Sequence, residues 1–219
     1  LKKIINFGKI ALVGNFFRSK KSLKKFNISL NFCLKCKHLQ ISEILNQNVL
    51  FKNYVWETGI SKSNITLIKN LIIQFKKYGV KKGSQILEIA SNDGTLLHLI
   101  KKKYKCFVLG VDPAKNIISS ISDERITVIN DYFTEKVSKE VVAKYGSVDL
   151  IMANNVFAHI SDIKGTTTAI KNTLSDEGVF IFEVHYLGKI IQEMQYDMIY
   201  HEHLYYYSLL SAIEHFKKK

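Results

Sequence analysis

Residues 88–97 read EIASNDGTLL, and this stretch joins a short apolar run to a helical one through a turn of small and polar residues. The run QILEIA before the turn is typical of a β-strand, and TLLHLIKKK after it is typical of a helix. Such a turn presents backbone amides and a helix N-terminus to a ligand. Gly94 is its only glycine, so the G-x-G-x-x-G fingerprint of dinucleotide binding is absent. The stretch therefore predicts a ligand-binding loop and argues against a dehydrogenase.

The same alternation of strand and helix continues along the chain. Five β-rich runs occur, namely QILEIA (85–90), CFVLGVD (106–112), ITVIN (126–130), VDLIMAN (148–154) and GVFIFEV (178–184). Runs that are apolar on both faces and alternate with helices are typical of a doubly wound parallel sheet. Ligands of such sheets bind at the carboxyl ends of the strands. Asp112 ends the second run, where its carboxylate can accept both hydroxyls of a ribose or, alternatively, cap a helix.

Composition restricts the partners that we expect. The net charge is +13, but Arg18 and Arg125 are the only arginines among 32 basic side chains. Specific DNA readers rely on arginine for bidentate contacts, so we expect no nucleic acid and only a modest attraction for anionic small molecules. No apolar run approaches the roughly 18 residues of a membrane span, and the N-terminus lacks the pattern of a signal peptide. We expect no membrane partner and a cytoplasmic location.

Cys33 and Cys36 form a CxxC pair, which is the standard half of a tetrahedral zinc site. Two ligands do not complete such a site, and Cys106 lies in an apolar run where we expect it to be buried. We expect a second cysteine pair upstream of Leu1, in preference to a ligand role for His38. A redox motif, which needs a strand before the pair and a helix after it, and a vacant remnant of a zinc site are the alternatives.

The stretch YHEHLYYYS at 200–208 places two imidazoles and a carboxylate within four residues. Such groups are costly to bury unless each has a polar partner. On an extended segment His201 and His203 would share a face and could bind a metal together. The alternative is that they are core histidines whose nitrogens bond to neighbouring carbonyls.

Other aromatic and imidazole side chains have simpler interpretations. The tyrosines at 205–207 are expected to pack, while His159 and His185 are expected to be structural or to line a pocket. The segment 208–219 begins like a helix with Ser208 as its N-cap and closes on three lysines, which suit a helix C-terminus. Leu1 is not an initiator methionine, and the sequence stops with the helix at 208–219. We therefore expect the chain to be truncated at both ends.

The pairing of Glu88 inside the first run with Asp112 at the end of the second resembles the class I S-adenosylmethionine methyltransferases. More narrowly, the chain resembles the sugar C-methyltransferases that act on nucleotide-linked keto-deoxysugars. The resembling stretches are EIASNDGTLL (88–97), GVDPAKN (110–116), NDYF (130–133), ANNVFAHISD (153–162), FEVHYL (182–187) and QYDMIYHEHLYYYSL (195–209). The resemblance implies an α/β, Rossmann-like doubly wound fold.

The resemblance also implies an organisation into domains. Residues 1–45 would be a partial zinc-binding module with Cys33 and Cys36 as ligands. Residues 46–81 would be a linker helix region, and residues 82–219 a C-terminally incomplete S-adenosylmethionine-binding core. The upstream cysteine pair, the last two strands and the substrate domain of the family would be missing.

The family's cofactor residues carry over onto matching positions of this sequence. The implied contacts to S-adenosylmethionine are Glu88, Ala90, Asn92, Asp93, Gly94, Asp112, Asn130, Asp131, Tyr132, Asn154 and Asn155. Ala90 departs from the pattern, because family members usually have glycine there. Its Cβ would crowd the methionyl part of the cofactor and reduce the affinity.

Methylation of carbon requires a carbanion equivalent, such as the enolate formed by removing a proton next to a ketone. By resemblance, His203 would be the base, since imidazole can accept a proton at neutral pH. Glu202 would hold the sugar or orient the imidazole, and Tyr200 would donate a hydrogen bond to the substrate. Tyr54 and His201 would contact the substrate, with packing on a linker helix as the alternative for Tyr54.

The function implied is that of an S-adenosylmethionine-dependent C-methyltransferase, which acts on a nucleotide-linked keto-deoxysugar through a base-generated enolate. Two alternatives stay open, because a fold does not fix a substrate. The first is a catalytically incomplete cofactor-binding or interaction module. The second is a methyltransferase of another small molecule.

Overall fold

The computed structural model describes residues 1–14, 23–52, 54–121, 123–124 and 126–217. The chain divides into two compact units, each with its own sheet. The parallel-sheet unit comprises Gln47–Val156 and Asp162–Glu183, and the antiparallel-sheet unit comprises Leu1–Asn46, Phe157–Ser161 and Val184–Lys219. The division into a zinc-binding module (1–45), a linker helix region (46–81) and a cofactor-binding core (82–219) assigns functions to parts of the chain, and it stays a prediction. Within the described part of the chain, no helix has the length and hydropathy that crossing a membrane requires.

The parallel-sheet unit contains five strands, each at the place that the sequence predicts. They are β4 (Gln85–Ile89), β5 (Phe107–Val111), β6 (Thr127–Ile129), β7 (Val148–Asn154) and β8 (Leu174–Glu183), and β8 begins earlier than predicted. All pair in parallel in the order β6-β5-β4-β7-β8. The chain thus leaves β4 in one direction and later returns to its other side. This reversal is the switch point at which ligands of such sheets bind.

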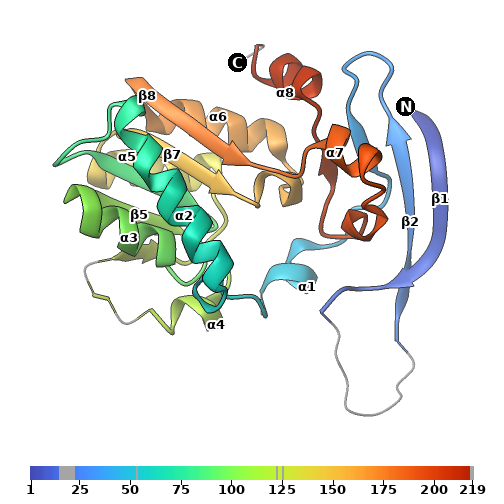
Figure 1. Ribbon diagram of the computed structural model, residues 1–219, viewed down its shortest axis with the longest axis horizontal. Helices are drawn as coiled ribbons and strands as arrows, with labels where there is room; N and C mark the ends of the chain where they lie inside the picture. The colour runs from blue at the N-terminus through green and yellow to red at the C-terminus, as the bar shows by residue number, and fades with distance from the viewer. Residues whose placement is uncertain (15–22, 53, 122, 125, 218–219) are drawn as a thin grey trace. The chain divides into compact units, whose positions relative to one another are not determined.

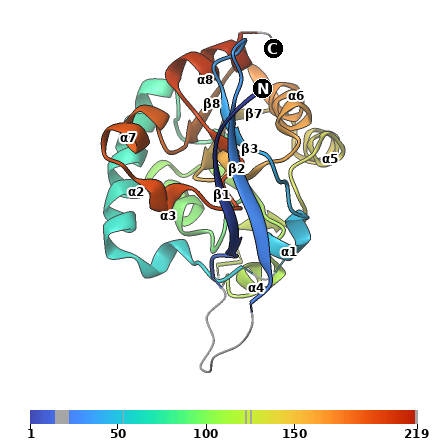
Figure 2. The ribbon, with the colours of Figure 1, turned by 90° about the vertical axis from the view of Figure 1, so that its right-hand side faces the viewer.

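Helices cover both faces of this sheet, as a doubly wound fold requires. Figures 1 and 2 show α2 (Lys62–Gln74) and α3 (Thr95–Tyr104) on one face, and α5 (Glu135–Tyr145) and α6 (Ile163–Thr173) on the other. Shorter elements complete the unit: α1 (Gln47–Phe51), α4 (Lys115–Ile118) and the 3-10 turns η1 (Thr58–Ile60), η2 (Phe75–Tyr78). The prediction of a doubly wound α/β fold is confirmed.

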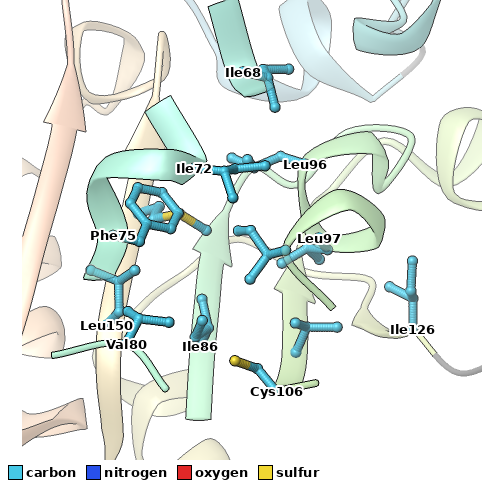
Figure 3. Close-up of a cluster of buried hydrophobic side chains, with 13 residues drawn as sticks. Ile68, Ile72, Phe75, Val80, Ile86, Leu96, Leu97, Cys106, Ile126 and Leu150 are labelled. Carbon is cyan, nitrogen blue, oxygen red and sulfur yellow. The ribbon is translucent and has the colours of Figure 1, made fainter. Parts of the chain in front are cut away.

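A cluster of buried apolar side chains holds α2 and α3 against the sheet (Figure 3). Ile86 of β4 is fully buried there, and Leu97 of α3 packs in the same cluster. Leu87, the next residue of β4, is also fully buried and points to the opposite face. Because both faces are covered, the strands read as continuous apolar runs rather than alternating ones. Cys106 is buried just before β5, as predicted.

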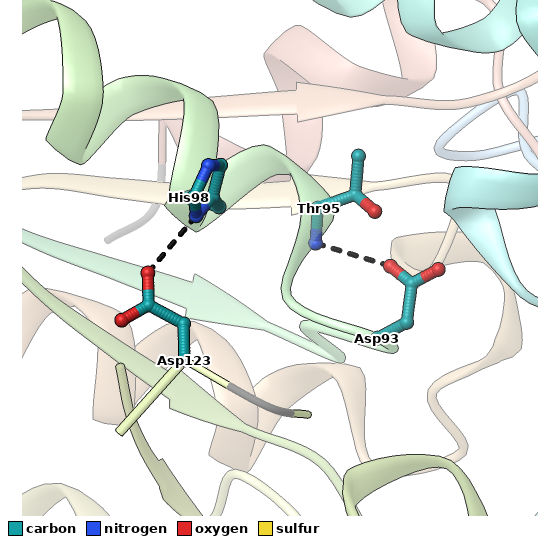
Figure 4. Close-up of polar contacts among 4 residues, drawn as sticks. All are labelled: Asp93, Thr95, His98 and Asp123. Atoms are coloured by element: carbon teal, nitrogen blue, oxygen red, sulfur yellow. Dashed lines mark hydrogen bonds and ion pairs between the residues drawn. The ribbon is translucent and has the colours of Figure 1, made fainter. Parts of the chain in front are cut away.

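The start of α3 is fixed by the residues that precede it. Gly94 adopts the left-handed conformation (φ 72°), and Asp93 Oδ1 accepts a hydrogen bond from the Thr95 backbone N–H at 3.0 Å (Figure 4). One turn later His98 Nδ1 lies 3.0 Å from Asp123 Oδ2. Three lysines occupy the last turn, where positive charge complements the helix dipole.

The antiparallel-sheet unit combines the two ends of the chain. Its strands are β1 (Lys2–Ala11), β2 (Lys25–Phe32), β3 (Leu39–Ile41) and β9 (Tyr205–Tyr206), in the order β1-β2-β3-β9. Its helical elements are η3 (Phe157–His159), α7 (Leu187–Gln192), η4 (Tyr196–Met198) and α8 (Leu209–Phe216). The buried cluster is Ile28, Leu30, Ile41, Leu187, Ile190, Leu204 and Tyr206. Residues far apart in sequence therefore share one small core.

Ser208 caps α8 as the sequence predicts. Its Oγ accepts from the Ser211 backbone N–H at 3.1 Å, and Ser211 Oγ accepts from the Ser208 backbone N–H at 3.0 Å, which is a reciprocal capping box. The helix ends at Phe216. The predicted helix runs to Lys219, and residues 218–219 lie outside the described part of the chain.

Candidate functional site

The loop after β4 turns tightly through alternate left-handed residues. Ala90, Asn92 and Gly94 have φ values of 55°, 52° and 72°. For a residue with a Cβ this conformation costs roughly 1 to 2 kcal/mol, whereas glycine adopts it freely. The conformation gives a backbone reason, separate from cofactor crowding, for the preference for glycine at the position of Ala90.

Asp112 joins this loop to the one after β5. Its Oδ2 accepts from the Asn92 backbone N–H and its Oδ1 from the Ala114 backbone N–H, each at 2.8 Å. Burial raises the pKa of the carboxyl group, while these two hydrogen bonds act to lower it. The bond to Ala114, two residues further on, fixes the turn that leads into α4, and the bond to Asn92 holds the loop after β4.

Two polar side chains lie buried at this edge, each with an oxygen that has no partner among the described residues. They are Glu88 through Oε2 and Ser91 through Oγ. Burial raises the pKa of Glu88 well above its usual range, and the charges of Asp112 and Asp93 act in the same direction, whereas a hydrogen bond from the Asn154 side chain acts to lower it. Each unpaired buried group costs about 1 to 3 kcal/mol. A polar ligand that bonded to them would recover this energy.

A cavity of about 170 Å³ opens beyond the ends of β5 and β6. Its lining residues are Asn48, Lys52, Pro113, Asn130, Asp131 and Tyr132. Asn130 Nδ2 donates to the Asp112 carbonyl at 2.9 Å, and Tyr132 Oη donates to Asn48 Oδ1 at 3.2 Å. The three residues of the NDYF stretch named as cofactor contacts therefore surround one cavity.

The remaining residues named for the cofactor use their side chains within the protein. Asn155 Nδ2 donates to Glu183 Oε1 at 2.7 Å. Asn92 and Asp93 bond to backbone groups of residues 56–59. Tyr54, named for the substrate, is partly exposed just before that segment and is not part of a helix. The roles of these residues toward ligands stay predictions.

In the antiparallel-sheet unit, His203 has both ring nitrogens engaged. Nδ1 lies 2.8 Å from the Met198 carbonyl, and Nε2 lies 3.0 Å from Tyr200 Oη. A carbonyl oxygen only accepts, so Nδ1 must carry a proton, and Nε2 of the neutral ring is then the acceptor of the Tyr200 O–H. Burial raises the pKa of Tyr200 to about 12, with a further contribution from Glu202. The imidazole is thus oriented with its basic nitrogen toward a phenol.

His201 and Glu202 occupy different surroundings from His203. The His203 backbone N–H donates to the Tyr200 carbonyl at 3.1 Å, so the stretch is a turn, and the extended segment required for a shared metal face is absent. His201 is buried, with Nε2 donating to the Phe26 carbonyl at 3.2 Å. Burial raises the pKa of Glu202 to about 7. Met198 and Tyr200, rather than Glu202, orient the imidazole of His203.

Two histidines that were expected to be structural or to line a pocket lie against His203. The ring centroids of His159 and His185 are each 4.9 Å from the His203 centroid. Burial lowers the pKa of His159 to about 3, with His203 and His185 contributing. The sequence carries one signal for this grouping, because His159 and His185 each follow closely after the carboxyl end of a predicted strand. Of the tyrosine run, Tyr206 and Tyr207 are buried, which confirms their packing role.

The CxxC pair lies in the turn between β2 and β3. The Cys36 backbone N–H points at Cys33 Sγ at 3.5 Å, and the Cys33 backbone N–H donates to the His38 carbonyl at 2.8 Å. Hydrogen bonds from Cys36 lower the pKa of the Cys33 thiol to about 7. A strand, not a helix, follows the pair, so the arrangement that a thioredoxin-like redox motif needs is not present here. The described residues contain no cluster of three or more metal-binding side chains.

Comparison with known proteins places this fold in a family. A family model described as a methyltransferase domain matches residues 64–218. The chain belongs to the methyltransferase domain family. The C-methyltransferase NovU of Streptomyces niveus is 29% identical to this methyltransferase over 210 residues. That alignment covers 94% of the present chain and 50% of NovU, so the chain spans about half the length of this relative.

Solved structures share the fold of this methyltransferase. The YcgJ protein of Bacillus subtilis matches with a TM-score of 0.53 and 17% identity, over 69% of this chain and 66% of its own. A candidate sarcosine dimethylglycine methyltransferase from Galdieria sulphuraria matches with a TM-score of 0.54 and 18% identity, over 71% and 61% of the two chains. The family match confirms the prediction of a methyltransferase domain, and these structures confirm that of its Rossmann-like fold.

The imidazole of His203 is expected to stay neutral at physiological pH. Burial lowers its pKa to about 4, because the imidazolium loses its hydration. The unfolded chain, with a histidine pKa near 6.5, then binds this proton more readily, so through this residue acidification from about pH 6.5 to 4 favours unfolding. The Cε1–H resonance, identified by its absence from His203→Asn, should titrate near pH 4 in the folded protein and near 6.5 in urea. A folded midpoint near 6.5 would contradict the burial effect.

Proposed function

We propose that this methyltransferase uses S-adenosylmethionine to methylate a carbon atom next to the ketone of a nucleotide-linked keto-deoxysugar. The observation that carries the proposal is the neutral imidazole of His203, whose Nε2 is held as an acceptor beside the Tyr200 hydroxyl. Methyl transfer to oxygen or nitrogen does not require a base that removes a proton from a carbon atom. The name of NovU, a C-methyltransferase, supports the same reaction type.

S-adenosylmethionine would be held at the carboxyl ends of β4, β5 and β6. The unpartnered oxygens of Glu88 and Ser91 fit a polar ligand at that edge. The cavity beside Asn130 and Asp131 is polar and fits a heterocycle or ribose. When bound, the cofactor supplies an electrophilic methyl group on a sulfonium.

The protein side of the reaction is proton removal and charge stabilisation. His203 Nε2 takes the proton from the carbon beside the ketone, and the electron pair of that C–H bond moves toward the carbonyl to give an enolate. The Tyr200 O–H, released from Nε2, is available to donate to the enolate oxygen. Glu202 would hold hydroxyl groups of the sugar. His201 and Tyr54 stay proposed substrate contacts.

A second candidate base is Glu202. Its pKa of about 7 matches neutral pH more closely than the value of about 4 for His203, and general bases work best when their pKa is near the operating pH. The partial exposure of Glu202 also leaves it accessible. Two alternative functions are compatible with the same cofactor loop. A catalytically incomplete module would bind the cofactor without transferring its methyl group, and a methyltransferase of another small molecule would differ in the acceptor.

We also propose a structural zinc ion bound by Cys33 and Cys36. The thiol pKa of about 7 at Cys33 and the hairpin turn around the pair suit half of a four-ligand site. The other two ligands would come from residues upstream of Leu1. Such an ion would cross-link the turn between β2 and β3 and would take no part in methyl transfer.

Asp112→Ala is expected to weaken binding of S-adenosylmethionine by about 1.5 to 3 kcal/mol, because it removes the charged carboxylate that would accept hydrogen bonds from the ribose hydroxyls of the cofactor. Isothermal calorimetry measures the change. Asp149→Ala is a matched control. Asp149 accepts from the Gln85 backbone N–H at 2.8 Å, at the amino ends of the strands and therefore away from the proposed cofactor. Binding of NADH in place of S-adenosylmethionine would rule out the proposed cofactor.

His203→Asn is expected to slow enolate formation by roughly 10² or more while leaving cofactor binding intact. The measurement is deuterium wash-in next to the ketone of a nucleotide-linked keto-deoxysugar, without methyl donor, in a version extended to the length of NovU. Tyr205→Phe is the control, since the hydroxyl of Tyr205 only donates to the Ser161 carbonyl. Unchanged exchange in His203→Asn, with loss in Glu202→Gln, would move the base to Glu202.

Zinc content is expected to depend on a second pair of ligands. The 219-residue chain should retain well under one zinc after dialysis against a chelator, and a version extended upstream should retain about one, as four-ligand structural sites do. Cys33→Ser with Cys36→Ser should abolish retention in the longer version. A full complement in the short chain would mean that another residue, such as His38, completes the site.

A further inference from the structure

Residues 54–60 form a segment, here named the strap, whose backbone is tied down by three side chains. Asn116 accepts from the Tyr54 backbone N–H at 3.2 Å and donates to the Tyr54 carbonyl at 2.8 Å. Asn92 accepts from the Thr58 backbone N–H at 2.9 Å and donates to the Trp56 carbonyl at 2.9 Å. Asp93 Oδ2 completes the set by accepting from the backbone N–H of residue 59 at 2.7 Å.

All three side chains belong to the loops that face the proposed cofactor. Asn92 and Asp93 lie in the loop after β4, and Asn116 lies in α4, the helix after Asp112. The backbone of Asn92 is itself held by Asp112. A ligand that bonded to the backbone of these loops would therefore restrain the same residues whose side chains fix the strap.

Packing does not explain the position of the strap. Trp56 is 54% exposed and Ile60 is 74% exposed, so its large apolar side chains remain largely in water while its backbone is bonded. Gly59 brings the strap close to the loop, because a Cβ on it would come within 2.7 Å of Thr95 Oγ1. Three of these hydrogen bonds are exposed and two are part-buried, and bonds of this kind each contribute only about 1 kcal/mol, so they can break singly.

We propose that Asn92, Asp93 and Asn116 are positioning residues that couple occupancy of the cofactor loops to the position of the strap. The inference rests on the proposed function, since it requires a cofactor at these loops. Ligand contacts at the loop after β4 immobilise Asn92 and Asp93, and these in turn immobilise residues 56–59. The partly exposed side chain of Tyr54 and the exposed side chain of Trp56 are thereby held more firmly for an organic substrate when the cofactor is bound. Coupling of this kind is reciprocal, so a free strap weakens cofactor binding by the same factor.

Trp56 is the only tryptophan of the chain, so its fluorescence reports on the strap alone. The test combines time-resolved anisotropy of Trp56 with calorimetry of S-adenosylhomocysteine. Asn116→Ala removes two of the bonds to the strap from an exposed position of α4, which favours normal folding. Lys115→Ala is the matched control, since Lys115 is the exposed neighbour on the same helix.

In the wild type, saturating S-adenosylhomocysteine should raise the residual anisotropy of Trp56. Asn116→Ala should lower this anisotropy without ligand and weaken binding about fivefold or more, at the lower end of usual coupling factors. Lys115→Ala should change neither. A Trp56 signal that ignores bound ligand, or wild-type affinity in Asn116→Ala, would overturn the coupling while leaving the proposed function intact. Absence of calorimetric binding to the wild type would instead overturn both.

Discussion

The carboxylate of Asp112 is the group on which the ligand-facing edge of the parallel sheet depends. Its two oxygens hold the backbone N–H groups of Asn92 and Ala114, so the loops after β4 and β5 keep a fixed spacing. Asn130 ties the loop after β6 to the loop after β5, because its side chain donates to the Asp112 carbonyl. Each bond offsets part of the cost of burying this carboxylate. One side chain thus organises three loops.

Elsewhere in the chain the orientation of a buried imidazole is set by a backbone acceptor. The Met198 carbonyl fixes the proton of His203 on Nδ1, and Nε2 is left as the basic nitrogen. No charged partner is required for this, and burial keeps the ring neutral. The tautomer therefore follows from the turn that places Met198 near His203 in sequence.

The parallel-sheet unit could be predicted from the sequence because its signals are local, whereas the four strands of the antiparallel sheet were not predicted. Burial on both faces of the parallel sheet produces apolar runs, and these mark all five strands. The strand β9 gave no such signal, since its two residues pair with β3 across most of the chain. Likewise, residue type placed Asn92 at the ligand-facing loop, but only the fold reveals that its side chain bonds to the strap. The gathering of His159 and His185 around His203 depends on tertiary structure in the same way.

The pairing of Leu39 with Tyr206 has a consequence for biosynthesis. A ribosome adds about 5 to 20 residues per second, so β3 leaves the exit tunnel on the order of ten seconds before its partner strand exists. During that interval one edge of the β1-β2-β3 sheet has free amide and carbonyl groups, which can pair with other chains. The nascent polypeptide is therefore exposed to self-association for this period, and a chaperone bound to residues 25–41 would cover the free edge until β9 is made.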